Sequence, residues 1–240
     1  MDIFYNSLNY YLIFNITYHG SSLILFLLDY FKLFINYKLQ KDRIEIMINS
    51  YKKILPVILR NTLVGIIPTF LIVGYYESMY ESIFDYWELL INLPLALIMT
   101  DIFFYCAHRL LHIPPLYKLF HKKHHEIIAP IGLSAVYMTI IDLYIGNILP
   151  VYLPLFILKA HPITFKIWMI LTTFNTVIFA HSGFVFLAKF HDYHHSNFSK
   201  NYGANIFMDR LFGTYHHGIE NKLNVPRERM NNNLKKNIHN

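Results

Sequence analysis

The sequence has little cysteine, little charge and few signals of β-strands. Its 240 residues include a single cysteine, Cys106, which excludes an intrachain disulfide. Only 15% of the residues are charged, against roughly 25% in a typical soluble domain. Its aromatic and β-branched runs are too long and too continuous for half-buried strands, in which apolar and polar residues alternate. These absences argue against a disulfide-stabilised, soluble or β-rich protein.

Several functional signatures are also missing. No signal peptide with a cleavage site is visible, so we expect no cleaved leader. The HExxH motif of zinc proteases is absent, because Ala129 stands where the second histidine would follow His125 and Glu126. The net charge is +6 with histidine neutral, but the basic residues lie where membrane topology expects them. We therefore expect no nucleic-acid partner.

What the sequence has in abundance is hydrophobic residues, at 55% of the chain. Four or five apolar stretches approach the length of about 20 residues that a helix needs to cross a bilayer; they lie near residues 10–36, 54–76, 87–106, 133–158 and 163–181. The more polar segment 37–53 is typical of an amphipathic helix at a membrane surface. The sequence thus predicts an all-α integral membrane bundle of four to five transmembrane or membrane-embedded helices.

The distribution of basic residues predicts how this bundle is oriented. Lysines and arginines flank the segments that carry most of the histidines, whereas the loop 77–88 is acidic and contains neither. The positive-inside rule then places the histidines in a cap on the cytoplasmic side.

The 14 histidines are concentrated in three runs: HRLLH (His108, His112), HKKHH (His121, His124, His125) and HDYHH (His191, His194, His195). Residues at i, i+3 and i+4 share one face of a helix, so each run is expected to present its rings from one helix face. Neutral imidazole is a ligand for iron, copper, zinc and nickel. Eight or nine such ligands are too many for one ion and suit two. A pH switch and non-catalytic metal binding remain alternatives.

Polar residues near these runs are candidate partners for the histidines. Asp101 lies two helical turns before His108 and could accept the second ring N–H of a ligand; otherwise it is a helix-end acid. Asp192 could do the same or be a solvated turn residue. Asn175, within an apolar stretch, could bond across helices. Asp142 is a costly intramembrane charge that could line a cavity or serve packing.

The three runs resemble the three histidine boxes of the fatty acid hydroxylase/sterol desaturase superfamily of membrane di-iron oxygenases. DIFFYCAHRLLHIPPLYKLFHKKHH is similar to the core of the C-4 methylsterol oxidases and cholesterol 25-hydroxylases. HSGF (181–184) and HDYHHSNFSKNYGANIFMDRLFGT resemble two further signatures of these enzymes. YKLQKDR (37–43), followed by LRNTLVGIIPTFLI, is similar to their upstream region. The short connection between His181 and His191 departs from many sterol-oxidising members and leaves the substrate open.

The resemblance implies a particular metal site and organisation. The implied ligands are His108, His112, His121, His124, His125, His191, His194 and His195, with His181 as a ninth. They would hold two non-haem iron ions, with dioxygen as co-substrate and electrons from NAD(P)H through a separate b-type cytochrome or its reductase. The chain would divide into an N-terminal membrane segment (1–34), a catalytic domain (35–215) and a polar tail (216–240).

The resemblance also implies oxidation of a C–H bond of a membrane lipid, in the endoplasmic reticulum. A sterol is the first expectation, oxidised at its C-4 methyl group. Sterol side-chain hydroxylation, sterol desaturation and fatty acyl hydroxylation are the alternatives within the superfamily. A metal- or lipid-binding membrane protein without catalysis is the alternative from another class.

Overall fold

The computed structural model describes residues 2–218, and these residues are helical apart from loops and one isolated antiparallel bridge between Lys38 and Phe184. The α-helices in this range are α1 (Ile3–Tyr30), α2 (Ile44–Leu59), α3 (Ile67–Ser78), α4 (Tyr86–Leu111), α5 (Pro114–Leu116), α6 (Ile140–Asp142), α7 (Leu149–Ile157), α8 (Pro162–Phe174), α9 (Lys189–Asn197) and α10 (Phe207–Leu211). From residue 219 onward, the predicted polar tail lies outside the described residues.

Wide, π-helical turns join or extend several of these helices. One such turn, Arg60–Gly65, runs α2 into α3, and another, Leu143–Ile148, runs α6 into α7. A third, Asn175–Ala180, extends α8. Five helical segments of the described chain are long and apolar enough to cross a membrane: Ile3–Tyr30, Lys41–Ser78, Tyr86–Leu111, Ile140–Ile157 and Pro162–Ala180. The prediction of an all-α membrane bundle is therefore confirmed.

Two predicted boundaries were wrong. The first helix begins at Ile3 rather than near residue 10, and it ends at Tyr30 because Lys32 and Phe34 adopt left-handed backbone conformations with φ of 55° and 58°. The segment predicted as a separate surface helix instead continues through α2 and α3 as one long helical stretch. The regular helix α2 already spans the predicted boundary at residues 53 and 54, and the π-helical turn then joins α2 to α3.

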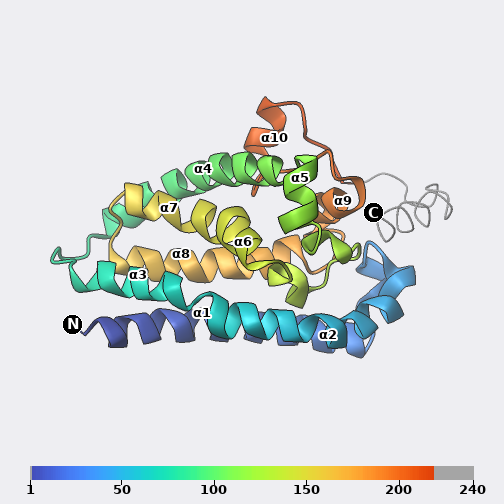
Figure 1. The fold of residues 1–240 in the computed structure, drawn as a ribbon, viewed down its shortest axis with the longest axis horizontal. Coiled ribbons are helices and arrows are strands. Elements are labelled where there is room, and N and C mark those ends of the chain that lie inside the picture. Colours follow the sequence, from blue (N-terminus) through green and yellow to red (C-terminus); the bar gives the residue numbers. More distant parts are fainter. Residues whose placement is uncertain (1, 219–240) are drawn as a thin grey trace.

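The bundle is elongated, with α1 and the α2–α3 segment running alongside each other in opposite directions (Figure 1). Close packing of α1 on α3 requires Gly74, because any side chain there would collide with Ser7. Helices α4, α7 and α8 complete the bundle; α5 and α9 lie at one end of the molecule, and α10 packs on the outside of α4 (Figure 1). That end carries all three histidine runs.

Candidate metal centre

The nine predicted histidines converge in two groups, each with one ring nitrogen per residue within 4.8 Å of the others. Group A consists of His108, His112, His121, His125 and His194, and group B of His124, His181, His191 and His195. The groups adjoin each other, since the rings of His125 and His195 have centroids 4.6 Å apart. All nine are buried except His112 and His191, which are half-buried.

Each HxxHH run is divided between the two groups. The i and i+4 members stay together: His121 and His125 belong to group A, and His191 and His195 to group B. The i+3 member crosses over, so that His124 joins group B and His194 joins group A. Rings that neighbour one another on a run, as expected for one helix face, are thus shared between the two groups in two of the three runs. The crossover interlocks the two groups.

Local backbone structure explains how the first two runs meet. His108 lies in the last turn of α4 and His112 follows directly as its C-terminal cap. Ile113 is extended before Pro114, as expected for a residue preceding proline. The chain then reverses through α5 and a π-helical turn that ends at His121. This turn brings the HKKHH run back onto α4.

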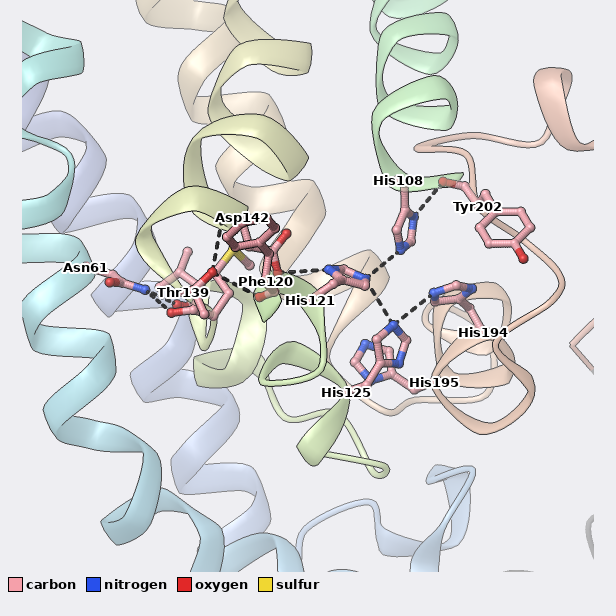
Figure 2. Close-up of polar contacts among 12 residues, drawn as sticks. Asn61, His108, Phe120, His121, His125, Thr139, Asp142, His194, His195 and Tyr202 are labelled. Carbon is pink, nitrogen blue, oxygen red and sulfur yellow. Dashed lines mark hydrogen bonds and ion pairs between the residues drawn. The ribbon is translucent and has the colours of Figure 1, made fainter. Parts of the chain in front are cut away.

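In four of the histidines, the Nδ1 atom forms a hydrogen bond with a group outside the two histidine groups. The Nδ1 atoms of His108 and His121 lie 2.8 Å from the Tyr202 carbonyl oxygen and from Asp142 Oδ2, respectively (Figure 2). In the same way, the Nδ1 atoms of His194 and His181 lie 2.7 Å from the carbonyl oxygens of Lys200 and Thr176. A carbonyl oxygen can only accept, so Nδ1 carries the hydrogen and Nε2 is left with a free lone pair.

The Nε2 atoms within each group also lie close to one another. In group A, the Nε2 of His121 is 3.1 Å from that of His108 and 3.1 Å from that of His125, which in turn is 3.3 Å from that of His194 (Figure 2). In group B, the Nε2 of His191 is 3.0 Å from those of His181 and His195.

Such an arrangement suits a cation. His108 and His121 both use their hydrogen at Nδ1, so their facing lone pairs repel each other unless a positive ion lies between them. Two imidazole nitrogens bound to one ion at about 2.1 Å lie about 2.9–3.4 Å apart, which matches the observed separations. The buried Nε2 of His112 and Nδ1 of His124 have no hydrogen-bond partner among the described residues. The donor set thus fits one metal ion in each group.

Seven of the histidines that lie outside the membrane-spanning helices are held neutral. Burial lowers the pKa of His112 to about 3 and that of His181 to about 4. Burial and the adjoining rings hold the pKa values of His124, His125 and His195 well below their usual range, and the same holds for His191 and His194. Neutral imidazole is the form that binds a metal ion.

Asp142 contacts a histidine ring directly, whereas the sequence indicated only that it could line a cavity or serve packing. Thr139 caps α6 by accepting the Asp142 backbone N–H at 3.2 Å, and its hydroxyl donates to the Phe120 carbonyl at 2.9 Å (Figure 2). These bonds place the Asp142 carboxylate against His121. The sequence signal was the cost of a charge inside an apolar stretch, but it did not reveal the partner.

The other polar candidates, Asp101, Asp192 and Asn175, have other contacts. Asp101 accepts the backbone N–H groups of Asn205 and Met208 at 2.7 and 2.9 Å. It therefore fixes the loop that follows Tyr202, whose carbonyl orients His108. Asp192 accepts a hydrogen bond from the Gln40 amide at 2.7 Å. Asn175 lines the cavity described next.

Asp209 anchors the same loop through the loop's backbone. Its carboxylate accepts the backbone N–H groups of Tyr202 and Gly203 at 2.9 and 2.7 Å. A side chain at Gly203 would collide with the carboxylates of Asp101 and Asp209. Backbone partners of this kind leave no spacing pattern in the sequence.

A cavity of about 830 Å³ leads from both histidine groups into the helical bundle. Rings from group A (His108, His121) and group B (His124, His181, His191) form part of its wall. The rest of the wall is mostly apolar and comes from α1, α3, α4, α7 and α8. Two hydroxyls on this wall, those of Thr69 and Thr100, are buried without a hydrogen-bond partner among the described residues.

Comparison with known proteins identifies relatives of this chain. The family model described as fatty acid hydroxylase matches residues 93–214, about half of the chain. Fatty acid hydroxylase domain-containing protein 2 of Homo sapiens is 38% identical over 54% of the chain and 39% of its own length. Fatty acid hydroxylase ahd1 of Mycosarcoma maydis is 34% identical over 69% of the chain and 45% of its own length.

A third relative is matched over most of both chains. Methylsterol monooxygenase erg25B of Aspergillus fumigatus is 28% identical over 89% of this chain and 79% of its own length. By contrast, the chain spans less than half the length of the two relatives described before it. No solved structure gives a significant match. The resemblance seen in the histidine runs is confirmed, and the chain belongs to the fatty acid hydroxylase family.

Proposed function

We propose that this protein is a membrane di-iron oxygenase that oxidises a C–H bond of a lipid, with a sterol as the first candidate and its C-4 methyl group as the position oxidised. The observation that carries the proposal is the pair of interlocked histidine groups, whose free ring nitrogens lie 3.0–3.3 Å apart at the end of an apolar cavity. Residues 35–215 would form the catalytic unit.

The nine histidines would hold the metal, five around one ion and four around the other. Nitrogen ligands alone suit several first-row metals, and the family favours iron, since its named relatives are hydroxylases and monooxygenases. When bound, a pair of irons would supply the electrons that activate dioxygen towards an unactivated C–H bond. The protein's part is to keep the imidazoles neutral and oriented; Asp142 does so by fixing the hydrogen of His121 at Nδ1.

The cavity would bind the substrate. Its volume of about 830 Å³ falls within the range of about 300–1,000 Å³ for small-molecule sites, and its apolar wall suits a lipid and excludes water. The unpaired hydroxyls of Thr69 and Thr100 offer a hydrogen bond to a polar group of that lipid. This favours a lipid that carries a hydroxyl group, such as a sterol, over a plain hydrocarbon chain.

Membrane orientation and electron supply complete the proposal. Lys52, Lys53 and Lys118 are exposed, whereas the loop 77–88 contains no lysine or arginine. By the positive-inside rule the histidine end would face the cytoplasm, in the endoplasmic reticulum. A basic surface there would suit an acidic donor such as a b-type cytochrome or its reductase, relaying electrons from NAD(P)H.

Fatty acyl hydroxylation is the second candidate. It is favoured by the relatives named fatty acid hydroxylase, one of which is matched over 69% of this chain. The family model is also described as fatty acid hydroxylase, and it covers all three histidine runs.

Expression in membranes that lack their own C-4 methylsterol oxidase would test the proposal by lipid profiling. We expect the wild type to consume 4-methylsterols and the His124→Ala variant to leave them unchanged. His217→Ala serves as the control, because His217 is exposed and belongs to neither group. Consumption of fatty acyl lipids instead would support the second candidate. Identical lipids with wild type and His124→Ala would overturn the catalytic proposal and leave a metal- or lipid-binding protein.

A further inference from the structure

A short segment between α1 and α2, Tyr37–Gln40, which we term the strap, lies against the histidine end. Its Leu39 N–H donates to the Gly183 carbonyl at 2.9 Å, and the Val185 N–H donates to the Tyr37 carbonyl at 2.9 Å. The strap is thereby paired in antiparallel fashion with the stretch that follows His181. Figure 1 shows the turn from α1 into α2 at the same end of the bundle as α9.

A buried charge secures this pairing. Lys38 forms an ion pair with Asp29, and both side chains are only 1% exposed. The Lys38 ammonium also donates to the Ser182 carbonyl at 2.6 Å, next to His181, while the Tyr51 hydroxyl donates to Asp29 at 3.1 Å. A buried ion pair costs desolvation and is weak grounds for stability alone. Its contact beside His181 indicates a role in placing that ring.

The same strap also reaches the HDYHH run and the turn that follows the HKKHH run. The Gln40 amide donates to Asp192, which follows His191 on α9, at 2.7 Å. It also donates to the carbonyl of Ile128 at 3.0 Å, four residues after His124. A single amide nitrogen thus donates to oxygen atoms of two separate segments of the chain.

The bonds of the strap end at the peptide after His181, at the residue after His191 and at Ile128, which follows the HKKHH run. Two of these three contacts lie directly beside members of group B, His181 and His191. The orienting partners of group A, by contrast, are Asp142 and the carbonyls of Tyr202 and Lys200, none of which belongs to the strap.

The need for such support is greatest at His181. This residue follows the last turn of the α8 extension, and Gly183 just beyond it has φ of 71°. No regular helix fixes the backbone there, so bonds from elsewhere in the fold must do so.

We propose that Lys38 and Gln40 are positioning residues for the metal ion of group B and leave that of group A unaffected. The inference rests on the proposed binding of one ion by each group. It also assigns a role to the sequence YKLQKDR, which the histidine runs by themselves do not explain.

Total metal per chain, measured by elemental analysis of detergent-purified protein, tests the inference. We expect two ions in the wild type and one in Gln40→Leu, which removes both amide bonds. The double variant Asp29→Asn/Lys38→Met should also hold one ion, and it avoids leaving an unpaired buried carboxylate. The control is Lys166→Met, which breaks another lysine–carboxylate pair, with Glu77 of α3, at 2.8 Å. It should keep two ions, since α3 and α9 lie at opposite ends of the bundle (Figure 1).

Combined variants identify which ion is lost. Gln40→Leu added to His181→Ala should leave one ion, as in His181→Ala alone, because both changes affect group B. Gln40→Leu added to His121→Ala should leave none. Two ions retained in both strap variants, or equal loss from both groups, would overturn the inference. If the wild type holds two ions of another metal, the proposal that the metal is iron is wrong. The strap variants would still test the positioning role in that case.

Discussion

Replacing Asp142 by asparagine or leucine tests how the protein orients its metal-binding rings. The Asp142 carboxylate is 1% exposed, lies 2.8 Å from the His121 Nδ1 and contributes to the cavity wall. Asparagine keeps an acceptor for the His121 N–H but removes the charge. Leucine removes the acceptor and leaves a buried N–H without a partner.

The structure sets the size of each effect. A hydrogen bond to a charged acceptor contributes about 1.5–3 kcal/mol and a neutral one about 0.5–1.5 kcal/mol, so Asp142→Asn should weaken metal binding in group A by about 1–1.5 kcal/mol. That corresponds to about a tenfold loss of affinity. Asp142→Leu should cost the full contribution, about a hundredfold, at the upper end of what loss of such a partner typically causes.

Chelator competition on the purified protein measures both affinities, with the ion of group B as an internal reference because Asp142 does not contact its histidines. We expect the order wild type, Asp142→Asn, Asp142→Leu for group A and no change for group B. Equal affinities in all three proteins would refute the assignment of Asp142 as the partner that orients His121. A larger loss with asparagine than with leucine would refute the reasoning from hydrogen-bond strength.

Three further perturbations have defined outcomes. Burial lowers the pKa of His112 to about 3 and of His181 to about 4, so both rings stay neutral until the pH falls towards those values. Metal affinity should therefore be nearly constant from about pH 7.5 to 5.5, whereas protonation of two histidines of ordinary pKa would lower the affinity about a hundredfold over that range. A steep loss of affinity in a pH titration would contradict this. Phe104 lines the cavity, with its ring centroid 5.3 Å from that of His108; Phe104→Trp should lower lipid turnover about a hundredfold by displacing the substrate, with unchanged metal content by elemental analysis as the control. Thr100→Val removes one unpaired cavity hydroxyl and should weaken binding of a hydroxylated lipid about fivefold, the loss of about 1 kcal/mol; ligand titrations should show no such loss for the same lipid without its hydroxyl.

Local patterns in the sequence were sufficient for the helices and for the identity of the clustered histidines. Long apolar stretches predict membrane helices because the bilayer leaves no other partner for the backbone, and each predicted stretch overlaps one of the five spans of the described chain. The end of the first helix depends on the backbone instead, since Lys32 and Phe34 just beyond it adopt left-handed conformations.

The histidine spacing determined which residues share a helical face, because i and i+4 positions are neighbours on a helix. The pairs His121/His125 and His191/His195 do stay together. Their i+3 neighbours, His124 and His194, cross to the other group, and only the tertiary structure decided this. Residues 124–126 form a tight 3₁₀ turn rather than continuing a helix, so ring directions there depend on how the chain packs against α9.

The orienting contacts were equally beyond the sequence. Three of the four Nδ1 partners are backbone carbonyls, at Tyr202, Lys200 and Thr176, and every residue has such a carbonyl whatever its side chain. The sequence by itself therefore determined which side chains can bind metal and that helices carry them. The tertiary structure alone decided how they divide between the two groups, because that depends on the path of loops whose backbone atoms complete the site.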